Sequence, residues 1–343
     1  MPQFPVFFHP AQLGHKPVYE WAFGQKLAHP ETTSRVSKIL AAIEGEGDAF
    51  VLQTPQPVPE ALLKRLFDPR LITLYQHAEE VLEPDVTFYP SVFPKRHQNR
   101  PDPKDIHHAG YFCYDSGTPL TKVTWTACSW SAACALGAAK RVASGESKIA
   151  YALSRPPGHH ASRDLFGGYC YFNNAALAVS ALRERGGKVA IVDIDFHHGN
   201  GTQAMFYRDP DVLFISIHGD PREFYPYFSG YADERGAGEG EGFTLNLPLP
   251  KGVDGQEYAR VLETHVLPAV RAHGADALVI SAGFDTYHED PIGHFALQTS
   301  DYGAIAGRLA SLGLPTVIVQ EGGYCVDALG ANVVTFLEGA QGR

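Results

Sequence analysis

The feature that most constrains the fold is a short apolar run, residues 189–192, that leads into acidic, histidine and glycine residues. The segment from Val189 to Gln203 reads VAIVDIDFHHGNGTQ. An apolar run of this length before a glycine-rich stretch is typical of a buried parallel strand that opens into a loop. Ligands of α/β sheets bind beyond the carboxyl ends of such strands. We therefore expect functional side chains directly after residue 192.

Two candidate metal ligands, Asp195 and His197, stand in this segment. Side chains two residues apart on an extended chain point the same way, so these two can converge on one centre. A carboxylate oxygen with an imidazole nitrogen suits Zn²⁺ or a similar divalent metal; ordinary loop hydrogen bonds are the alternative. Asp193 and Asn200 are placed to orient imidazole rings by accepting hydrogen bonds from them.

The rest of the chain predicts repeated βα units, most regularly after residue 124. We expect strands at residues 149–153, 188–194, 212–217, 277–281 and 316–319, and helices at residues 125–142, 174–185, 256–273, 301–312 and 326–338. Before them we expect an edge strand at residues 5–8, helices at residues 36–43, 59–67 and 71–82, and an irregular loop at residues 88–105. This order predicts an α/β fold, a three-layer αβα arrangement with a mostly parallel sheet. We expect one domain over residues 1–343, with entrance-forming segments in residues 1–123 and the catalytic core in residues 124–343.

Composition excludes several classes of protein. The chain has 343 residues, 44% hydrophobic and 19% charged, which is typical of a globular protein. A formal net charge of −10 without a basic stripe argues against nucleic-acid binding, and no apolar run reaches the roughly eighteen residues of a membrane span. Five cysteines without C-x-x-C spacing favour free thiols in a reducing compartment. With no visible signal peptide, we expect a cytoplasmic protein.

Three further patches follow predicted strands. In RPPGHHA, two prolines and a glycine hold a turn that presents His159 and His160, and paired imidazoles suit proton transfer near neutral pH. In SAGFD, Asp285 can complete a three-ligand metal site with an open position for water, as in catalytic zinc sites. In QEGGY, Tyr324 can donate a hydrogen bond to an oxyanion. The alternatives are a structural histidine pair and a tyrosine that only packs.

Together these patches resemble the arginase–deacetylase superfamily, and within it the branch of histone deacetylases and bacterial acetylpolyamine amidohydrolases. The segments RPPGHHA, FGGYCYFNNAA, DIDFHHGNGTQ, SAGFD and EGGY stand in the order and spacing of that family. The match is strong from about residue 125 onward. Segments FGGYC and HGDPREFYPYF are most similar to the bacterial acetylpolyamine amidohydrolases, and Asn200 is similar to the class II deacetylase pattern.

The resemblance implies a set of roles. It implies one Zn²⁺ per chain, with Fe²⁺ or Co²⁺ as possible substitutes, held by Asp195, His197 and Asp285. It implies these catalytic groups: His160 as general base and then acid, His159 in electrostatic support, Asp193 paired with His159, Asn200 paired with His160, and Tyr324 as oxyanion donor. It implies a substrate channel lined by Gly168, Tyr169 and Tyr225. It also implies structural K⁺ or Na⁺, at one site around Asp193, Asp195, His197, Ser216 and Ile217 and at a second around Phe206, Asp209 and Val212.

The function expected from these residues is zinc-dependent hydrolysis of the amide of an N-acylated primary amine, such as an acetylpolyamine. A class II-type protein-lysine deacylase is the main alternative. An arginase-like binuclear manganese hydrolase is weaker because SAGFD offers one carboxylate, and the pair His159–His160 with Tyr324 speaks against a non-enzymatic sensor of acylated amines. One segment departs from the polyamine-type pattern: residues 105–118 carry no glutamate, which leaves Asp115 as the nearest candidate carboxylate for a cationic tail of the substrate. We expect a homodimer in which residues 9–33 and 88–117 cover the mouth of the active site, so that slender acylated amines enter and folded proteins do not.

Overall fold

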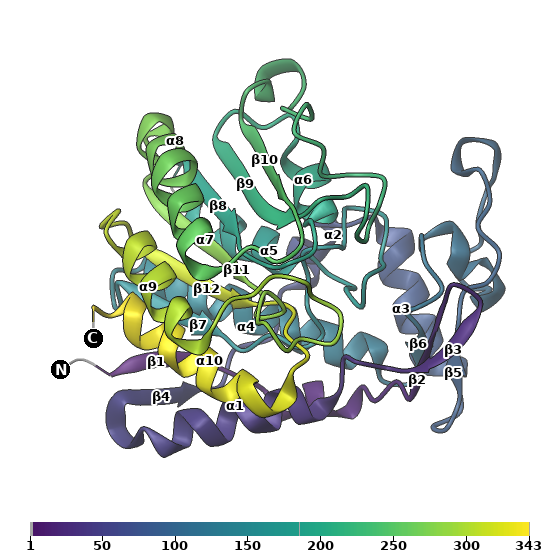
Figure 1. The fold of residues 1–343 in the computed structure, drawn as a ribbon. Coiled ribbons are helices and arrows are strands. Elements are labelled where there is room, and N and C mark those ends of the chain that lie inside the picture. Colours follow the sequence, from purple (N-terminus) through teal and green to yellow (C-terminus); the bar gives the residue numbers. More distant parts are fainter. Residues whose placement is uncertain (1–2, 185, 343) are drawn as a thin grey trace.

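A parallel sheet of eight strands runs through the middle of the computed structural model, with helices on both of its faces (Figure 1). The structure describes residues 3–184 and 186–342. In sheet order the strands are β10 (Thr244–Leu249), β9 (Val212–Gly219), β8 (Val189–Asp193), β11 (Ala277–Ala282), β12 (Thr316–Gln320), β7 (Ile149–Ala152), β1 (Phe4–Phe7) and β4 (Phe50–Gln53). Every pairing between them is parallel. The expected α/β three-layer fold is therefore confirmed.

The alternation of side chains along the strands explains the two helix layers. In β8, Val189 and Ile191 belong to the core on one face, whereas Ala190 and Val192 belong to the core on the other. A strand that is buried on both faces must be apolar throughout. One core is closed by α2 (Glu60–Leu66), α3 (Pro69–Val81), α4 (Thr124–Ala143), α5 (Asn174–Leu182) and α6 (Asn200–Phe206). The other is closed by α1 (Thr33–Gly45), α7 (Gly255–Val261), α8 (Leu267–His273), α9 (Thr299–Ala310) and α10 (Val326–Ala340).

The amino-terminal part corrects the sequence-based prediction. The expected edge strand at residues 5–8 is β1, which lies between β7 and β4 and is not at an edge. The edge is β4, which sequence patterning missed; of its residues only the first, Phe50, is buried. Two small antiparallel pairs, β2 (Tyr19–Ala22) with β3 (Gln25–Ala28) and β5 (Thr87–Phe88) with β6 (Leu120–Thr121), were also missed.

Three differences in the second half have local causes. The expected helix at residues 256–273 is divided by a π-helical turn, Leu262–Val266, just before Pro268, where proline has no amide hydrogen for the preceding turn. The strand β10 contains Pro248, which disguises a strand in sequence but is tolerated at the edge of a sheet. The helix α6 begins at Asn200, within the glycine-containing stretch that predicted a loop.

The sheet order explains how distant segments meet. The strands β8, β11, β12 and β7 are consecutive neighbours in the sheet. Each of the four chemistry-bearing patches follows one of these strands, so all four emerge side by side at the same edge. In addition, α1 packs along α10, so the amino-terminal part of the chain lies against its last helix (Figure 1).

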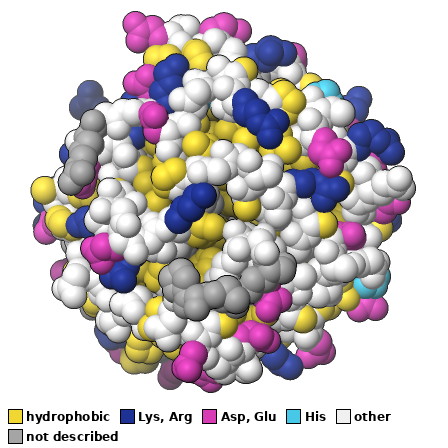
Figure 2. Space-filling view, turned by 90° about the vertical axis from the view of Figure 1, so that its left-hand side faces the viewer, with side chains coloured by type: hydrophobic (Ala, Val, Ile, Leu, Met, Phe, Trp, Pro, Cys, Tyr) yellow, Lys and Arg dark blue, Asp and Glu magenta, His cyan; other side chains and the backbone are white. Residues whose placement is uncertain are grey.

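The surface on the left-hand side of Figure 1 carries interspersed acidic and basic side chains (Figure 2). Of the helices in residues 3–184 and 186–342, none combines the length and the apolarity needed to cross a membrane.

Candidate active site

A pocket with a volume of about 680 Å³ opens where the loops after β7, β8, β11 and β12 meet. Its lining contains six of the residues singled out in the sequence: His160, Gly168, Tyr169, His197, Tyr225 and Tyr324. The pocket wall also has three carboxylates, Glu20, Asp115 and Glu223, and no lysine or arginine among its described lining residues. The mouth of the pocket is therefore acidic.

Three candidate metal ligands converge below the pocket. The ligand atoms of Asp195, His197 and Asp285 all lie within 4.8 Å of one another. His197 Nδ1 lies 2.9 Å from Asp285 Oδ2 and 3.4 Å from Asp195 Oδ1. Burial and the negative charge of Asp195 raise the pKa of Asp285 to about 7. Two buried carboxylates this close repel each other, so the donor set of two oxygens and one nitrogen fits a bound divalent cation.

Backbone hydrogen bonds lock these two carboxylates across neighbouring loops. Gly322 N donates to Asp195 Oδ2 at 2.8 Å, which ties the loop after β8 to the loop after β12. Phe196 N donates to Asp285 Oδ1 at 2.8 Å, which ties the loop after β11 back to the loop after β8. The metal ligands are thus preorganised by main-chain contacts between segments that are far apart in sequence.

The histidine pair lies beside the ligands, and each ring has its own partner. His159 Nδ1 contacts Asp193 Oδ2 at 3.0 Å, and His160 Nδ1 contacts Asn200 Oδ1 at 2.7 Å. Because the Asn200 amide oxygen can only accept, His160 Nδ1 donates to it, and the lone pair of His160 Nε2 stays available for a proton. These are the pairings that the family resemblance implied for Asp193 and Asn200.

The two histidines differ in electrostatic surroundings. Burial by itself would lower the pKa of His159, but the carboxylates of Asp195 and Asp193 outweigh it and raise that pKa to about 10. Burial, with the nearby His159 and His197, lowers the pKa of His160 well below its usual value. These surroundings favour the charged form of His159 and the neutral form of His160, which suits an electrostatic stabiliser beside a base.

Tyr324 completes the arrangement from the loop after β12. Its ring packs edge-on against Tyr169 with centroids 6.0 Å apart, and the Arg35 guanidinium carbon lies 4.8 Å above its centroid. Arg35 Nε also donates to Gly323 O at 2.7 Å. Among the described residues, none makes a hydrogen bond with the Tyr324 hydroxyl, which leaves that donor available to a substrate.

Sequence patterns did not reveal the buried charged side chains that hold the active-site loops together. Glu31 Oε1 accepts from Arg35 Nη1 at 2.9 Å and from Arg155 Nε at 2.8 Å. Through these two arginines, one carboxylate links the loop that carries Tyr324 to the turn that carries His159 and His160. Glu321 Oε2 accepts from the backbone N–H of Gly158 at 2.6 Å, and also from that of His159, and so fixes the same turn. The four-residue spacing of Glu31 and Arg35 was the only available signal, and it is equally typical of a surface pair.

The carboxylate of Asp115 has different hydrogen-bond partners from the one expected. Asp115 was expected to be the carboxylate nearest to a substrate amine, but Gly168 N and the Tyr225 hydroxyl donate to its Oδ2 at 2.6 and 2.8 Å. Gly117 and Thr118 occupy its other oxygen through their backbone N–H groups. Asp115 therefore holds the segment that carries Gly168 close to the segment that carries Tyr225. The carboxylate more available to a substrate is Glu20 of β2, which contacts the Tyr169 hydroxyl at 2.7 Å and was missed.

Gly168 has a clear structural reason to be glycine. Its φ is +56°, and a Cβ at this position would lie 2.2 Å from His160 Cδ2. A side chain at residue 168 would therefore displace the imidazole. The channel wall and the candidate base fit together only because this position has no side chain.

The residues predicted to surround monovalent cations lie in two separate places. Asp193 of β8 pairs in register with Ser216 of β9, which brings the first group together, and Ser216 Oγ contacts His218 Nδ1 at 2.8 Å. In the second group, Asp209 follows α6 and its carboxylate binds Arg183. Both cation sites stay predictions.

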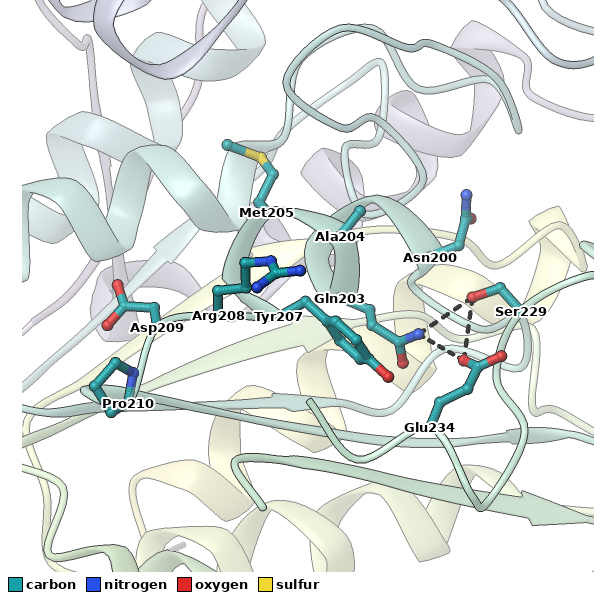
Figure 3. Close-up of a pocket in the computed structure, with 10 residues that line it drawn as sticks. All are labelled: Asn200, Gln203, Ala204, Met205, Tyr207, Arg208, Asp209, Pro210, Ser229 and Glu234. Atoms are coloured by element: carbon teal, nitrogen blue, oxygen red, sulfur yellow. Dashed lines mark hydrogen bonds between the residues drawn. The ribbon is translucent and has the colours of Figure 1, made fainter. Parts of the chain in front are cut away.

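A second cavity, of about 790 Å³, lies beside α6 (Figure 3). In it, Glu234 Oε2 accepts from Gln203 Nε2 at 2.6 Å and from Ser229 Oγ at 3.4 Å, as the dashed lines in Figure 3 mark. These bonds fasten the loop that carries Tyr225 to α6. Asn200 is the one lining residue that this cavity shares with the catalytic groups.

Comparison with known proteins identifies the family. A model of the histone deacetylase domain matches residues 29–340. The chain belongs to the histone deacetylase family. This deacetylase is 43% identical over 321 residues to acetylpolyamine amidohydrolase 1 of Pseudomonas aeruginosa, with 91% of each chain covered. It is 39% identical over 343 residues to the acetylpolyamine amidohydrolase of Burkholderia pseudomallei, with 97% of this chain and 98% of the relative covered.

Solved structures agree with the assignment. The crystal structure of an acetylpolyamine aminohydrolase from Burkholderia pseudomallei superposes with a TM-score of 0.92 at 38% identity, covering 98% of both chains.

Human histone deacetylase 7 is 40% identical over 213 residues, which cover 59% of this chain and 22% of that protein. The deacetylase is therefore an enzyme that hydrolyses amides, and its family implies a divalent metal, for which Asp195, His197 and Asp285 form a suitable ligand set.

Replacing Asp285 by Ala is expected to abolish stoichiometric binding of the divalent metal, because it removes one of three ligands. Metal content after dialysis, measured by mass spectrometry, checks this without any activity assay. The control is Asp276→Ala, at the opposite end of the same strand, where the carboxylate accepts from Lys188 N and from no other described residue. An Asp285→Ala protein that keeps its full metal content would contradict the ligand assignment.

Proposed function

We propose that this deacetylase is a zinc-dependent amidohydrolase that removes an acetyl or related acyl group from N-acylated primary amines such as acetylpolyamines. The observation that carries this proposal is the combination, in one pocket, of a three-ligand metal set, a histidine pair and a tyrosine with an acidic, aromatic mouth. The names of the relatives that match over nine-tenths of the chain or more support the same substrate class.

The proposed roles of the residues agree with their geometry. When bound at Asp195, His197 and Asp285, zinc supplies Lewis-acid polarisation of the acyl carbonyl and of a water molecule. His160 Nε2 takes a proton from the attacking water and then delivers it to the departing amine nitrogen. His159, oriented by its contact with Asp193, gives electrostatic support to the negative charge that develops. The Tyr324 hydroxyl donates to the oxygen of the former carbonyl.

The mouth of the pocket favours a substrate with a positive charge. Glu20, Asp115 and Glu223 line it without a lysine or arginine among the described lining residues, so the field there attracts cations. Aromatic faces along the walls, among them Trp21 and Tyr225, add cation–π attraction for an ammonium group. We therefore assign recognition of the distant amine to Glu20 and the surrounding aromatic rings.

Replacing Tyr324 by Phe is expected to lower kcat by about 10²–10³-fold, as for the loss of one oxyanion donor, while KM changes little. The hydrogen bond strengthens only as charge develops on oxygen, so substrate binding does not depend on it. Steady-state kinetics with an acetylated diamine measures both constants. Wild-type turnover by Tyr324→Phe would remove Tyr324 from the mechanism.

The substrate class is tested by comparing kcat/KM for acetylcadaverine, its uncharged alkyl analogue and an acetyl-lysine peptide. We expect the charged amine to be the best substrate, because it fits a narrow acidic channel. Glu20→Gln is expected to raise KM for acetylcadaverine and to leave the uncharged analogue unaffected, which makes the analogue an internal control. If the peptide is hydrolysed best, the alternative, a class II-type protein-lysine deacylase, replaces the proposal.

We propose that the deacetylase acts as a homodimer that covers the pocket mouth. Three segments place exposed apolar side chains at this mouth: Phe23 is 86% exposed, Phe228 61% and Phe93 45%. The rings of Phe23 and Tyr227 lie 6.3 Å apart, which joins two of the segments into one patch. Contiguous exposed apolar surface of this kind marks an interaction site, and a second copy there would narrow the entrance.

The double variant Phe23→Ser, Phe228→Ser is expected to shift the protein from dimer to monomer in sedimentation equilibrium at micromolar concentration. The control is Leu52→Ser on the edge strand β4, which is similarly apolar and 45% exposed but lies outside the mouth. A wild-type monomer would contradict the dimer directly.

Two further assignments complete the proposal. We propose structural K⁺ or Na⁺ ions in the two groups of residues described above. We also propose that the enzyme works in the cytoplasm, a reducing compartment that suits its five free cysteines, four of them buried.

A further inference from the structure

Asp290 binds two loops of the active site through its carboxylate. Its Oδ1 accepts from the backbone N–H groups of Ile292 and Gly293, both at 3.1 Å. Its Oδ2 accepts from the backbone N–H groups of Tyr324 at 2.6 Å and Cys325 at 3.0 Å. The first pair of bonds lies within residues 290–293. The second pair reaches across to the loop after β12.

These four bonds satisfy a carboxylate that is only 7% exposed. Among the described residues, Asp290 forms no ion pair, so backbone N–H groups supply the stabilisation that a buried charge requires. Two of them belong to Tyr324 and Cys325 directly before α10, where the amino end of a helix favours a negative charge. The position of Tyr324 and the buried charge of Asp290 therefore depend on each other.

The loop that carries Tyr324 needs such an anchor. Gly322 and Gly323 precede the tyrosine, and Gly323 has a φ of +116°, which glycine adopts readily. An oxyanion donor must lie within about 2.7–3.1 Å of the oxygen it stabilises. A displacement of about 1 Å at a catalytic group can cost about 10²-fold in rate. A backbone fixed by a short charged hydrogen bond at Tyr324 N meets this requirement.

We propose that Asp290 is a positioning residue that sets the Tyr324 hydroxyl for catalysis, an inference that rests on the role proposed for Tyr324. It does so by fastening the tyrosine backbone to the turn that contains Pro291 and Ile292. Both of those residues line the substrate pocket. Asp290 thus keeps the Tyr324 hydroxyl at a fixed position relative to the pocket wall, formed by Pro291 and Ile292, against which the acyl amine lies.

The test uses Asp290→Asn, because this change keeps the size of the side chain. An amide has one accepting oxygen, and its NH₂ group would face two N–H donors, so one of the two pairs of bonds must be lost. The matched control is Asp254→Asn at the start of α7, where Oδ1 accepts from Glu257 N at 2.9 Å. Asn caps a helix as well as Asp does, so no change is expected there.

We expect Asp290→Asn to lower kcat for an acetylated diamine by about 10- to 100-fold, with KM within about twofold of wild type. In the Tyr324→Phe background the same change is expected to lower kcat by less than about twofold, because the donor that it positions is already absent. Metal content is expected to stay unchanged. A purely structural role would lower kcat equally in both backgrounds.

Three outcomes would overturn the proposal: wild-type kcat in Asp290→Asn, an equal loss in the Tyr324→Phe background, or loss of the metal, which would mean an effect through Asp285. Failure of the proposed function is distinguishable, because Tyr324→Phe alone would then turn over at the wild-type rate. If Asp290→Asn does not fold, Asp290→Ser, with one small acceptor, enters the same cycle and is judged by the same outcomes.

Discussion

The structure depends most on the close approach of two buried carboxylates, Asp195 and Asp285, at the carboxyl ends of neighbouring strands. Each is held by a backbone N–H of another loop, from Gly322 and Phe196. Two negative charges in a buried place require positive compensation, and the family implies that a divalent metal supplies it. The loops after β8, β11 and β12 are therefore held together at the place where these two negative charges need a cation.

A second buried charge cluster ties the amino-terminal part of the chain to this unit. Glu31 binds Arg35 and Arg155 with side chains that are almost completely buried. Removing one partner of a buried ion pair typically costs about 3–5 kcal/mol of the free energy of unfolding, because the other charge is left without compensation. Arg35 lies over the ring of Tyr324 and Arg155 begins the histidine turn, so residues 31–35 belong to the catalytic structure although they lie far from it in sequence.

The chemistry and the selectivity of the enzyme come from different kinds of structure. The catalytic groups stand on loops directly after buried strands and are fixed by backbone hydrogen bonds. The mouth is built from the β2–β3 pair and from surface loops that carry exposed aromatic rings. Loops on a rigid scaffold can change without loss of the core, so one catalytic arrangement can serve different substrates.

The sequence by itself determined the α/β class, most strands of the sheet and the three residues of the candidate metal set, because apolar runs followed by Asp and His are local patterns. It could not give the place of β1 and β4, since strand order depends on which edges pair across long separations. It also could not give the hydrogen-bond partners of Asp115, Glu20, Glu31 and Asp290, because a carboxylate's role depends on the donors that face it. Those donors, from Gly168 N to Tyr324 N, come from segments that only the tertiary structure brings together.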